Sequence, residues 1–122
     1  MRWMLRLEQG RIVDGWSSLE LKRLIYMTGR RIRYASAPTL RDDAVYFKSG
    51  SLYSCEEEEG FTCRAYAGNR YNFMNSIAIV ETADGHVYMA AMMSNVLRVN
   101  SAVEHQSLAT FIERIMADLH DG

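Results

Sequence analysis

The chain has 122 residues, a formal net charge of −1 and a pI near 6.3, so it carries no strongly basic surface of the kind that binds nucleic acid. Its composition, 48% hydrophobic and 24% charged, supports a folded core, and its length predicts a single domain over residues 1–122. No apolar run approaches the ~20 residues of a membrane-spanning helix.

The first part of the chain predicts two helices. Apolar residues between positions 3 and 7 favour a short helix that ends at Gly10. Ser17 and Glu20 have the spacing of a capping box, which predicts that a second helix begins there. Gly29 is expected to end that helix, because glycine commonly follows the last helical turn.

The middle of the chain predicts three strands. The candidate strands are 44–53, 76–81 and 86–94. The last two are separated by Ala83-Asp84-Gly85, which is a hairpin signal. Strands that follow one another through short turns pair antiparallel, so we expect a three-stranded antiparallel sheet.

The C-terminal segment predicts a long amphipathic helix. Ser101 and Glu104 form a second capping-box pattern at its start. Apolar residues then recur with the helical period: Leu108, Phe111, Ile112, Ile115, Met116 and Leu119. With the preceding elements, this gives an α+β fold of about three antiparallel strands with flanking helices.

One of the two lysines of the chain, Lys48, lies inside an apolar and aromatic strand and is followed by Ser49, Gly50 and Ser51. A lysine in a strand can protect a sheet edge from aggregation, or it can serve a site. Lys48-Ser49-Gly50 also matches the K-[ST]-G box of class A β-lactamases and penicillin-binding proteins.

The order of the elements resembles the C-terminal part of that family from the first residue to the last. The segment "NSIAIVETADGHVYMAAMMSN" is similar to the last two strands of the family domain, and "HQSLATFIERIMADL" is similar to its closing helix. The resemblance therefore implies that residues 1–122 form a partial β-lactamase-like domain of a bacterial serine hydrolase.

The resemblance assigns roles to the box residues. Lys48 and Ser49 would bind the carboxylate of a β-lactam or a peptidoglycan peptide, and Gly50 would let the substrate approach the strand. The backbone N–H of Ser51 would be one donor of the oxyanion hole. No cofactor and no metal ion are implied.

Other parts of the family's active site are missing from this sequence. No serine is followed by lysine at the third position, so there is no S-x-x-K nucleophile, and there is no S-D-N or Y-x-N triplet. The "SIAIVET" strand lacks the arginine that many members use to hold the carboxylate, and Arg70 or Arg98 are the candidates to replace it. We therefore expect the isolated chain to be inactive as an enzyme. The alternative is a non-catalytic interaction module derived from the same fold.

The remaining polar residues give weaker signals. His86, His105 and His120 are far apart without metal-ligand spacing, so we interpret each as structural or exposed. The run Glu56–Glu59 is interpreted as a solvated loop.

Cys55 and Cys63 lie close enough in sequence to form a disulfide, and two free thiols are the alternative. The family works mostly in the periplasm or outside the cell, where disulfides persist. The first ten residues, however, carry interleaved charges that are not typical of a signal peptide, and the localisation is left open.

Within the strand at 86–94, the segment "VYMAAMMS" has no charge and no proline, so it lacks the usual protection of a sheet edge. In the family, a strand from the start of the domain pairs with it. We therefore expect a homodimer that forms through this edge and the last helix.

Overall fold

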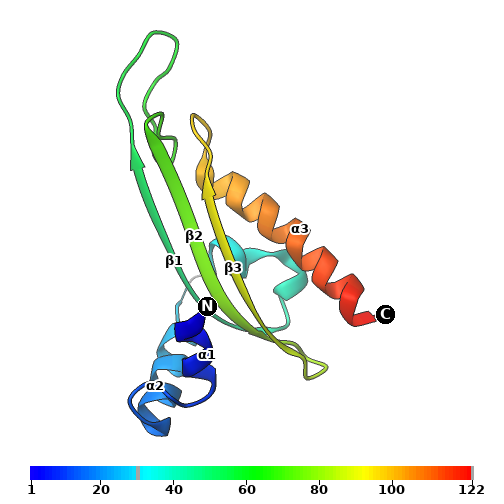
Figure 1. Ribbon diagram of the computed structural model, residues 1–122. Helices are drawn as coiled ribbons and strands as arrows, with labels where there is room; N and C mark the ends of the chain where they lie inside the picture. The colour runs from blue at the N-terminus through cyan, green and yellow to red at the C-terminus, as the bar shows by residue number, and fades with distance from the viewer. Residues whose placement is uncertain (30, 122) are drawn as a thin grey trace.

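The computed structural model of the protein describes residues 1–29 and 31–121. Within them, the fold is α+β, with one three-stranded antiparallel sheet and three α-helices, as expected (Figure 1). The elements in chain order are α1 (Arg2–Glu8), α2 (Gly15–Tyr26), the 3₁₀ turns η1 (Arg33–Ser36) and η2 (Pro38–Leu40), β1 (Ala44–Ser54), β2 (Tyr71–Glu81), β3 (Val87–Asn95) and α3 (Ser101–Asp121).

The sheet is a meander in the order β1-β2-β3. The register of β1 and β2 runs from Ala44↔Glu81 to Ser54↔Tyr71, so both strands pair over their full length. β2 and β3 are joined by a tight turn at Gly85, whose φ of +95° is in the region that favours glycine. The hairpin signal at this turn is confirmed, whereas β2 begins five residues before the expected start at position 76.

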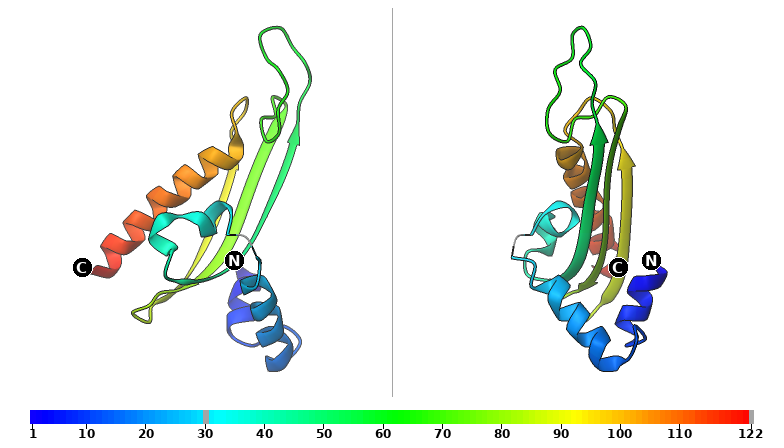
Figure 2. Two further views of the ribbon diagram at one scale, coloured as in Figure 1. Left: turned by 180° about the vertical axis from the view of Figure 1, so that it is seen from behind. Right: turned by 90° about the vertical axis from the view of Figure 1, so that its left-hand side faces the viewer.

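Helices cover both faces of the sheet (Figure 2). A larger core lies between one face and the segments α3, η1 and η2, and it includes Phe47, Ala78 and Ala109. A smaller core lies on the opposite face, where Met4 and Leu7 of α1 pack on Ile79. Figure 1 shows that α1 and α2 sit at one end of the sheet, and the part of this face near the β1–β2 loop extends beyond them.

Both capping-box patterns lie at the start of a helix, but the prediction that their serines cap it is wrong. α2 begins at Gly15, and its N-cap is Asp14, whose Oδ1 accepts a hydrogen bond of 2.7 Å from the backbone N–H of Ser17. α3 is capped by Asn100, whose Oδ1 accepts from the backbone N–H of Ala102 at 3.0 Å. In both cases an Asx residue just upstream of the expected serine reaches the free N–H groups of the first turn.

The helix ends are predicted with mixed success. Gly10 follows α1 with a φ of +68°, as expected of a glycine that ends a helix. α2 ends at Tyr26, so the prediction that Gly29 closes it is wrong.

In the described part of the chain, no helix combines the length and the apolarity that a membrane span requires.

The amphipathic helix expected here is observed as α3, but the sheet leaves four of its six large apolar residues exposed. Phe111 is 60% exposed and Leu119 is 68% exposed, and Leu108 and Ile115 are also exposed. The buried face of α3 instead carries small and polar side chains: Ser101, His105, Ala109 and Glu113. His105 and Glu113 are compatible with burial because Tyr34, Ser76 and Tyr88 bring hydroxyl partners.

Candidate functional site: the box strand β1

The residues Lys48, Ser49, Gly50 and Ser51 lie in the middle of β1, and β1 is an edge strand. Because side chains alternate along a strand, Lys48 is on the face of α1 and α2, and Ser49 is on the face of α3. Lys48 is exposed, and its Nζ donates to the carbonyl oxygen of Ser49 at 2.5 Å. This contact holds the ammonium group beside the strand that carries it.

The surface around Gly50 is open. A Cβ added at Gly50 would meet nothing within 4 Å, and Ser51 beside it is exposed. In the register of the sheet, Gly50 lies opposite Asn75, which lies opposite Met93 of β3. One exposed surface therefore crosses all three strands on the face that α1 and α2 leave uncovered at this end. We call it the open shelf, and it consists of Lys48, Gly50, Leu52, Phe73, Asn75 and Met93.

The open shelf combines a charge with apolar and aromatic area. Lys48 supplies the cation, while Leu52, Phe73 and Met93 are all at least 40% exposed. The ring of Phe73 stacks on that of Tyr71, with centroids 5.8 Å apart. A shallow hollow of ≈ 420 Å³ lies at the β2–β3 side of the shelf. This arrangement can bind an anionic group at Lys48 and an apolar body beside it.

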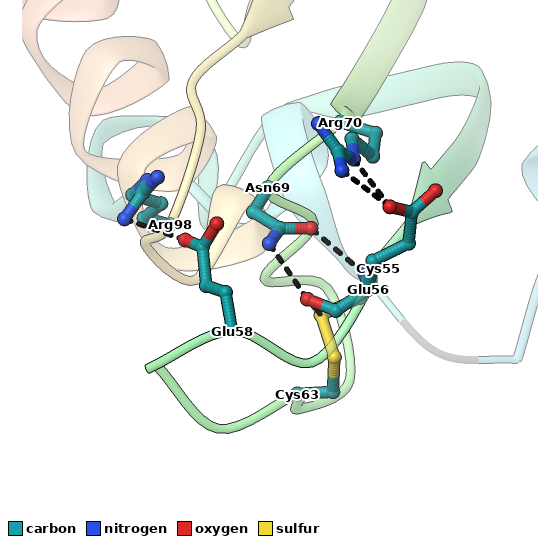
Figure 3. Close-up of polar contacts among 7 residues, drawn as sticks. All are labelled: Cys55, Glu56, Glu58, Cys63, Asn69, Arg70 and Arg98. Atoms are coloured by element: carbon teal, nitrogen blue, oxygen red, sulfur yellow. Dashed lines mark hydrogen bonds and ion pairs between the residues drawn. A yellow bond between two sulfur atoms is a disulfide. The ribbon is translucent and has the colours of Figure 1, made fainter. Parts of the chain in front are cut away.

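The two arginines that could supply a second carboxylate contact both have acidic partners in the β1–β2 loop (Figure 3). Arg70 donates from Nε to Glu56 Oε2 at 2.9 Å, and Arg98 reaches Glu58 Oε1 at 2.7 Å. Two of the four glutamates of the acidic run therefore hold the loop in place. Both arginines therefore form ion pairs with the β1–β2 loop, and neither belongs to the open shelf.

The loop after β1 is closed by a disulfide between Cys55 and Cys63 (Figure 3). Directly beside it, the side chain of Asn69 accepts from the backbone N–H of Glu56 at 2.9 Å and donates to its carbonyl oxygen at 2.7 Å. Asn69 is buried and replaces the strand partner that Glu56 would have if the ladder continued. The sequence allowed the disulfide, but it gave no signal for the Asn69 contact.

Gly68 fixes the path of the same loop. A Cβ at this position would lie 2.1 Å from the carbonyl oxygen of Tyr71 and 2.7 Å from that of Ser54. Since neither backbone atom can move without disturbing the β1–β2 pairing, only glycine fits here. The loop that follows the box strand is therefore tightly specified at its base.

The histidines do not form a site with the box residues. His105 is buried, and its Nε2 is 3.0 Å from Ser76 Oγ while its Nδ1 is 3.3 Å from Ser94 Oγ. Burial, and to a smaller extent the Arg33 guanidinium, lower the pKa of His105 to about 4. His105 is therefore neutral and structural, in line with our interpretation of the sequence.

His86 and His120 stack on each other, with ring centroids 4.4 Å apart, at the far end of the sheet. In residues 1–29 and 31–121, no three His, Cys, Asp or Glu side chains gather in a way that could hold a metal ion.

Glu113 is a buried polar residue that no motif in the sequence indicates. It is 2% exposed, and its carboxyl group accepts hydrogen bonds from the hydroxyls of Tyr34 and, at 2.5 Å, Tyr88. Burial raises the pKa of Glu113 to about 7. In the sequence, a buried glutamate in the middle of an amphipathic helix looks the same as a solvent-exposed glutamate. The hydrophobic periodicity of α3 therefore could not predict that Glu113 is buried.

Comparisons of the chain with models of known protein families, with curated proteins and with solved structures find no match.

Proposed function

We propose that this chain is the C-terminal portion of a β-lactamase-like or penicillin-binding serine hydrolase, and that β1 is its substrate-recognition strand. The observation that carries the proposal is the position of Lys48-Ser49-Gly50 on an exposed edge strand, with its lysine in solvent and its glycine uncovered. A box buried in the core could not meet a substrate, and on the central strand its backbone N–H groups would be used in pairing with both neighbours.

Charge and geometry support a carboxylate ligand for this strand. Lys48 is exposed, and no carboxylate of the described residues forms an ion pair with it. Its ammonium group is therefore available to an anion. The outer edge of β1 pairs with no described strand, so its free backbone N–H groups can donate to a ligand. A backbone donor near Ser51 is the kind of group that stabilises an oxyanion.

The chain on its own would recognise substrate without cleaving it. Acyl transfer needs an activated hydroxyl, and an oxyanion donor without a nucleophile retains only a small residual effect. Ser49 and Ser51 are the hydroxyls nearest to Lys48 in sequence, but no base contacts either of them in the described hydrogen bonds. The nucleophile would therefore have to come from another polypeptide segment that carries S-x-x-K.

The test is to find that segment and assay it together with this chain. The DNA upstream of the Met1 codon is sequenced, and any S-x-x-K polypeptide encoded there is produced with this chain and exposed to benzylpenicillin. Mass spectrometry is expected to show an adduct of one benzylpenicillin on the S-x-x-K polypeptide and none on this chain alone. The absence of an adduct from the combined preparation would contradict the proposal.

The alternative is a non-catalytic interaction module. The exposed apolar residues of α3 favour it, because they form a surface that no described segment covers. If the upstream DNA encodes no S-x-x-K polypeptide and benzylpenicillin does not bind, this alternative stands.

A further inference from the structure

Strand β3 (Val87–Asn95) ends the sheet on the side opposite β1, and no described strand pairs with its outer edge. Its nine residues contain no charged side chain and no proline. Natural proteins usually protect such an edge with a lysine, a proline or a bulge. The free N–H and C=O groups of β3 are therefore ready to pair with another antiparallel strand.

A row of apolar side chains on α3 is exposed near this edge. We call it the α3 stripe, and it consists of Leu108, Phe111, Ile115 and Leu119. These positions follow the helical spacing of three and four residues, so they share one side of α3. All four are more than 40% exposed. An apolar row of this length on a helix usually marks a contact surface.

The edge of β3 and the α3 stripe belong to one surface. A hollow of ≈ 210 Å³ lies between them, and its apolar lining includes Ala91 of β3 and Ile112 and Met116 of α3. By the helical period, Ile112 lies on α3 between its buried face and the stripe, and Met116 lies on the same face as Ala109, two turns further along. Figure 1 shows α3 on the β3 side of the sheet. One apolar surface therefore runs from the open edge, across the hollow, to the stripe.

We propose that a second copy of this chain docks on this surface in a symmetric dimer. A two-fold axis perpendicular to the sheet and passing near Ala91, the central residue of β3, makes the two β3 strands antiparallel. The same axis places both α3 helices on one face of the resulting six-stranded sheet. Each α3 stripe then faces the α3 helix of the other copy. A single two-fold axis therefore covers both the edge of β3 and the α3 stripe.

The chemistry of this surface favours a second copy of the chain over other partners. A foreign strand could pair with β3 and leave the α3 stripe exposed, whereas a second copy brings a matching stripe. The absence of charge on β3 means that the paired strands meet no like-charge repulsion, and the net charge of −1 opposes association only weakly.

The dimensions of the surface are also adequate. β3 and α3 each extend for about 30 Å, at ~3.3 Å per strand residue and ~1.5 Å per helix residue. A contact along both elements, which are stacked about 10 Å apart, covers an area that approaches the ~800 Å² per chain of a standard interface. The inference does not depend on the hydrolase proposal.

The test is light scattering with the full chain over a range of concentrations. The wild-type protein is expected to have twice the chain mass of 14.0 kDa. Ala91→Lys places two ammonium groups opposite each other at the axis, and Phe111→Glu puts a charge in the middle of the stripe. Each is expected to raise the dimer dissociation constant by about tenfold or more.

The matched control is Leu19→Glu, which adds a carboxylate at a similarly exposed apolar position of α2 and should leave the dissociation constant unchanged. Far-UV circular dichroism checks that each variant remains folded. A wild-type protein that stays monomeric at every concentration would overturn the proposal. So would a dimer whose dissociation constant is insensitive to both Ala91→Lys and Phe111→Glu.

Discussion

The hydroxyl of Tyr88 on β3 donates a hydrogen bond of 2.5 Å to Glu113 Oε2 on α3. Tyr34 of η1 donates to the other oxygen of the same carboxyl group. Glu113 thus links the long helix to the sheet and to the 3₁₀ turns on the same face. Its described hydrogen-bond partners are neutral hydroxyls, so burial favours the protonated carboxyl group.

The first prediction is that Glu113 makes the protein less stable as the pH rises. Its pKa is about 7 in the folded protein against an ordinary value of 4.5, so between these values the folded state holds a proton that the unfolded state has lost. The stabilisation is complete below pH ~4.5 and has been lost above pH ~7, with a slope of at most about 1.4 kcal/mol per pH unit. Urea unfolding of the wild type and Glu113→Gln at a series of pH values measures it.

Glu113→Gln keeps a neutral side chain at every pH and should remove the Glu113 contribution, so that its pH dependence differs from that of the wild type. The same slope in the variant and the wild type would show that Glu113 is ionised in the folded protein.

The second prediction concerns His105 and has the opposite sign. The pKa of His105 is lowered to about 4 from an ordinary value of 6.5, chiefly by burial, so the unfolded chain takes up a proton first as the pH falls. Its contribution to stability is present above pH ~6.5 and is lost as the pH drops towards 4. Replacing His105 with glutamine should remove this loss on acidification, so that stability between pH ~4.5 and ~6.5 falls with rising pH through Glu113 alone.

Because the Glu113 and His105 effects oppose each other between pH ~4.5 and ~6.5, the wild-type curve is flatter there than either variant's curve. An acid limb that is unchanged in His105→Gln would exclude His105 as its cause.

The third prediction is that Gly68 cannot be replaced. Gly68→Ala forces a methyl group against the carbonyl oxygens of Tyr71 and Ser54, and it should lower the free energy of unfolding by about 3 kcal/mol. Gly50→Ala is the matched control, because a Cβ there meets nothing within 4 Å, and its effect on stability should be below about 1 kcal/mol. Equal losses in the two variants, measured by chemical unfolding, would argue against the close approach at Gly68.

The fourth prediction concerns the disulfide between Cys55 and Cys63. Thiol titration of the native, air-oxidised protein should find no reactive thiol, and two after reduction and unfolding. In the loop-entropy account, the Cys55→Ser, Cys63→Ser double variant loses about 2–3 kcal/mol of stability. Two reactive thiols in the untreated protein would contradict the bridge.

The sequence predicted the element order well, because that order depends on local signals. The short turn at Gly85 and the helical period of α3 are such signals, and both correspond to observed elements. The early start of β2 was missed because Asn72 is a poor strand former. The folded chain buries Asn72, and its amide donates to the carbonyl oxygens of Val96 and Val99. These tertiary contacts are invisible in the local sequence.

The burial of polar residues on α3 was missed for a related reason. Hydrophobic periodicity identifies the apolar side of a helix but does not say which partner covers it. Here Glu113 and His105 are buried because tyrosine and serine hydroxyls from other elements meet them. The candidate site was predicted only in part. Lys48 and its neighbours stand out as a motif, but nothing local to Arg70 and Arg98 indicates their contacts with the β1–β2 loop.

The most direct test of the central claim, that β1 recognises a carboxylate through Lys48, is an NMR titration of the ¹⁵N-labelled chain with benzylpenicillin. We predict that the amide signals from Lys48 to Leu52 shift with added ligand, and that the shifts are weaker at high salt. They should be lost in Lys48→Ala and retained in Arg41→Ala, which removes another exposed cation. Signals of β1 that do not move, or that move equally in Lys48→Ala, would contradict the account.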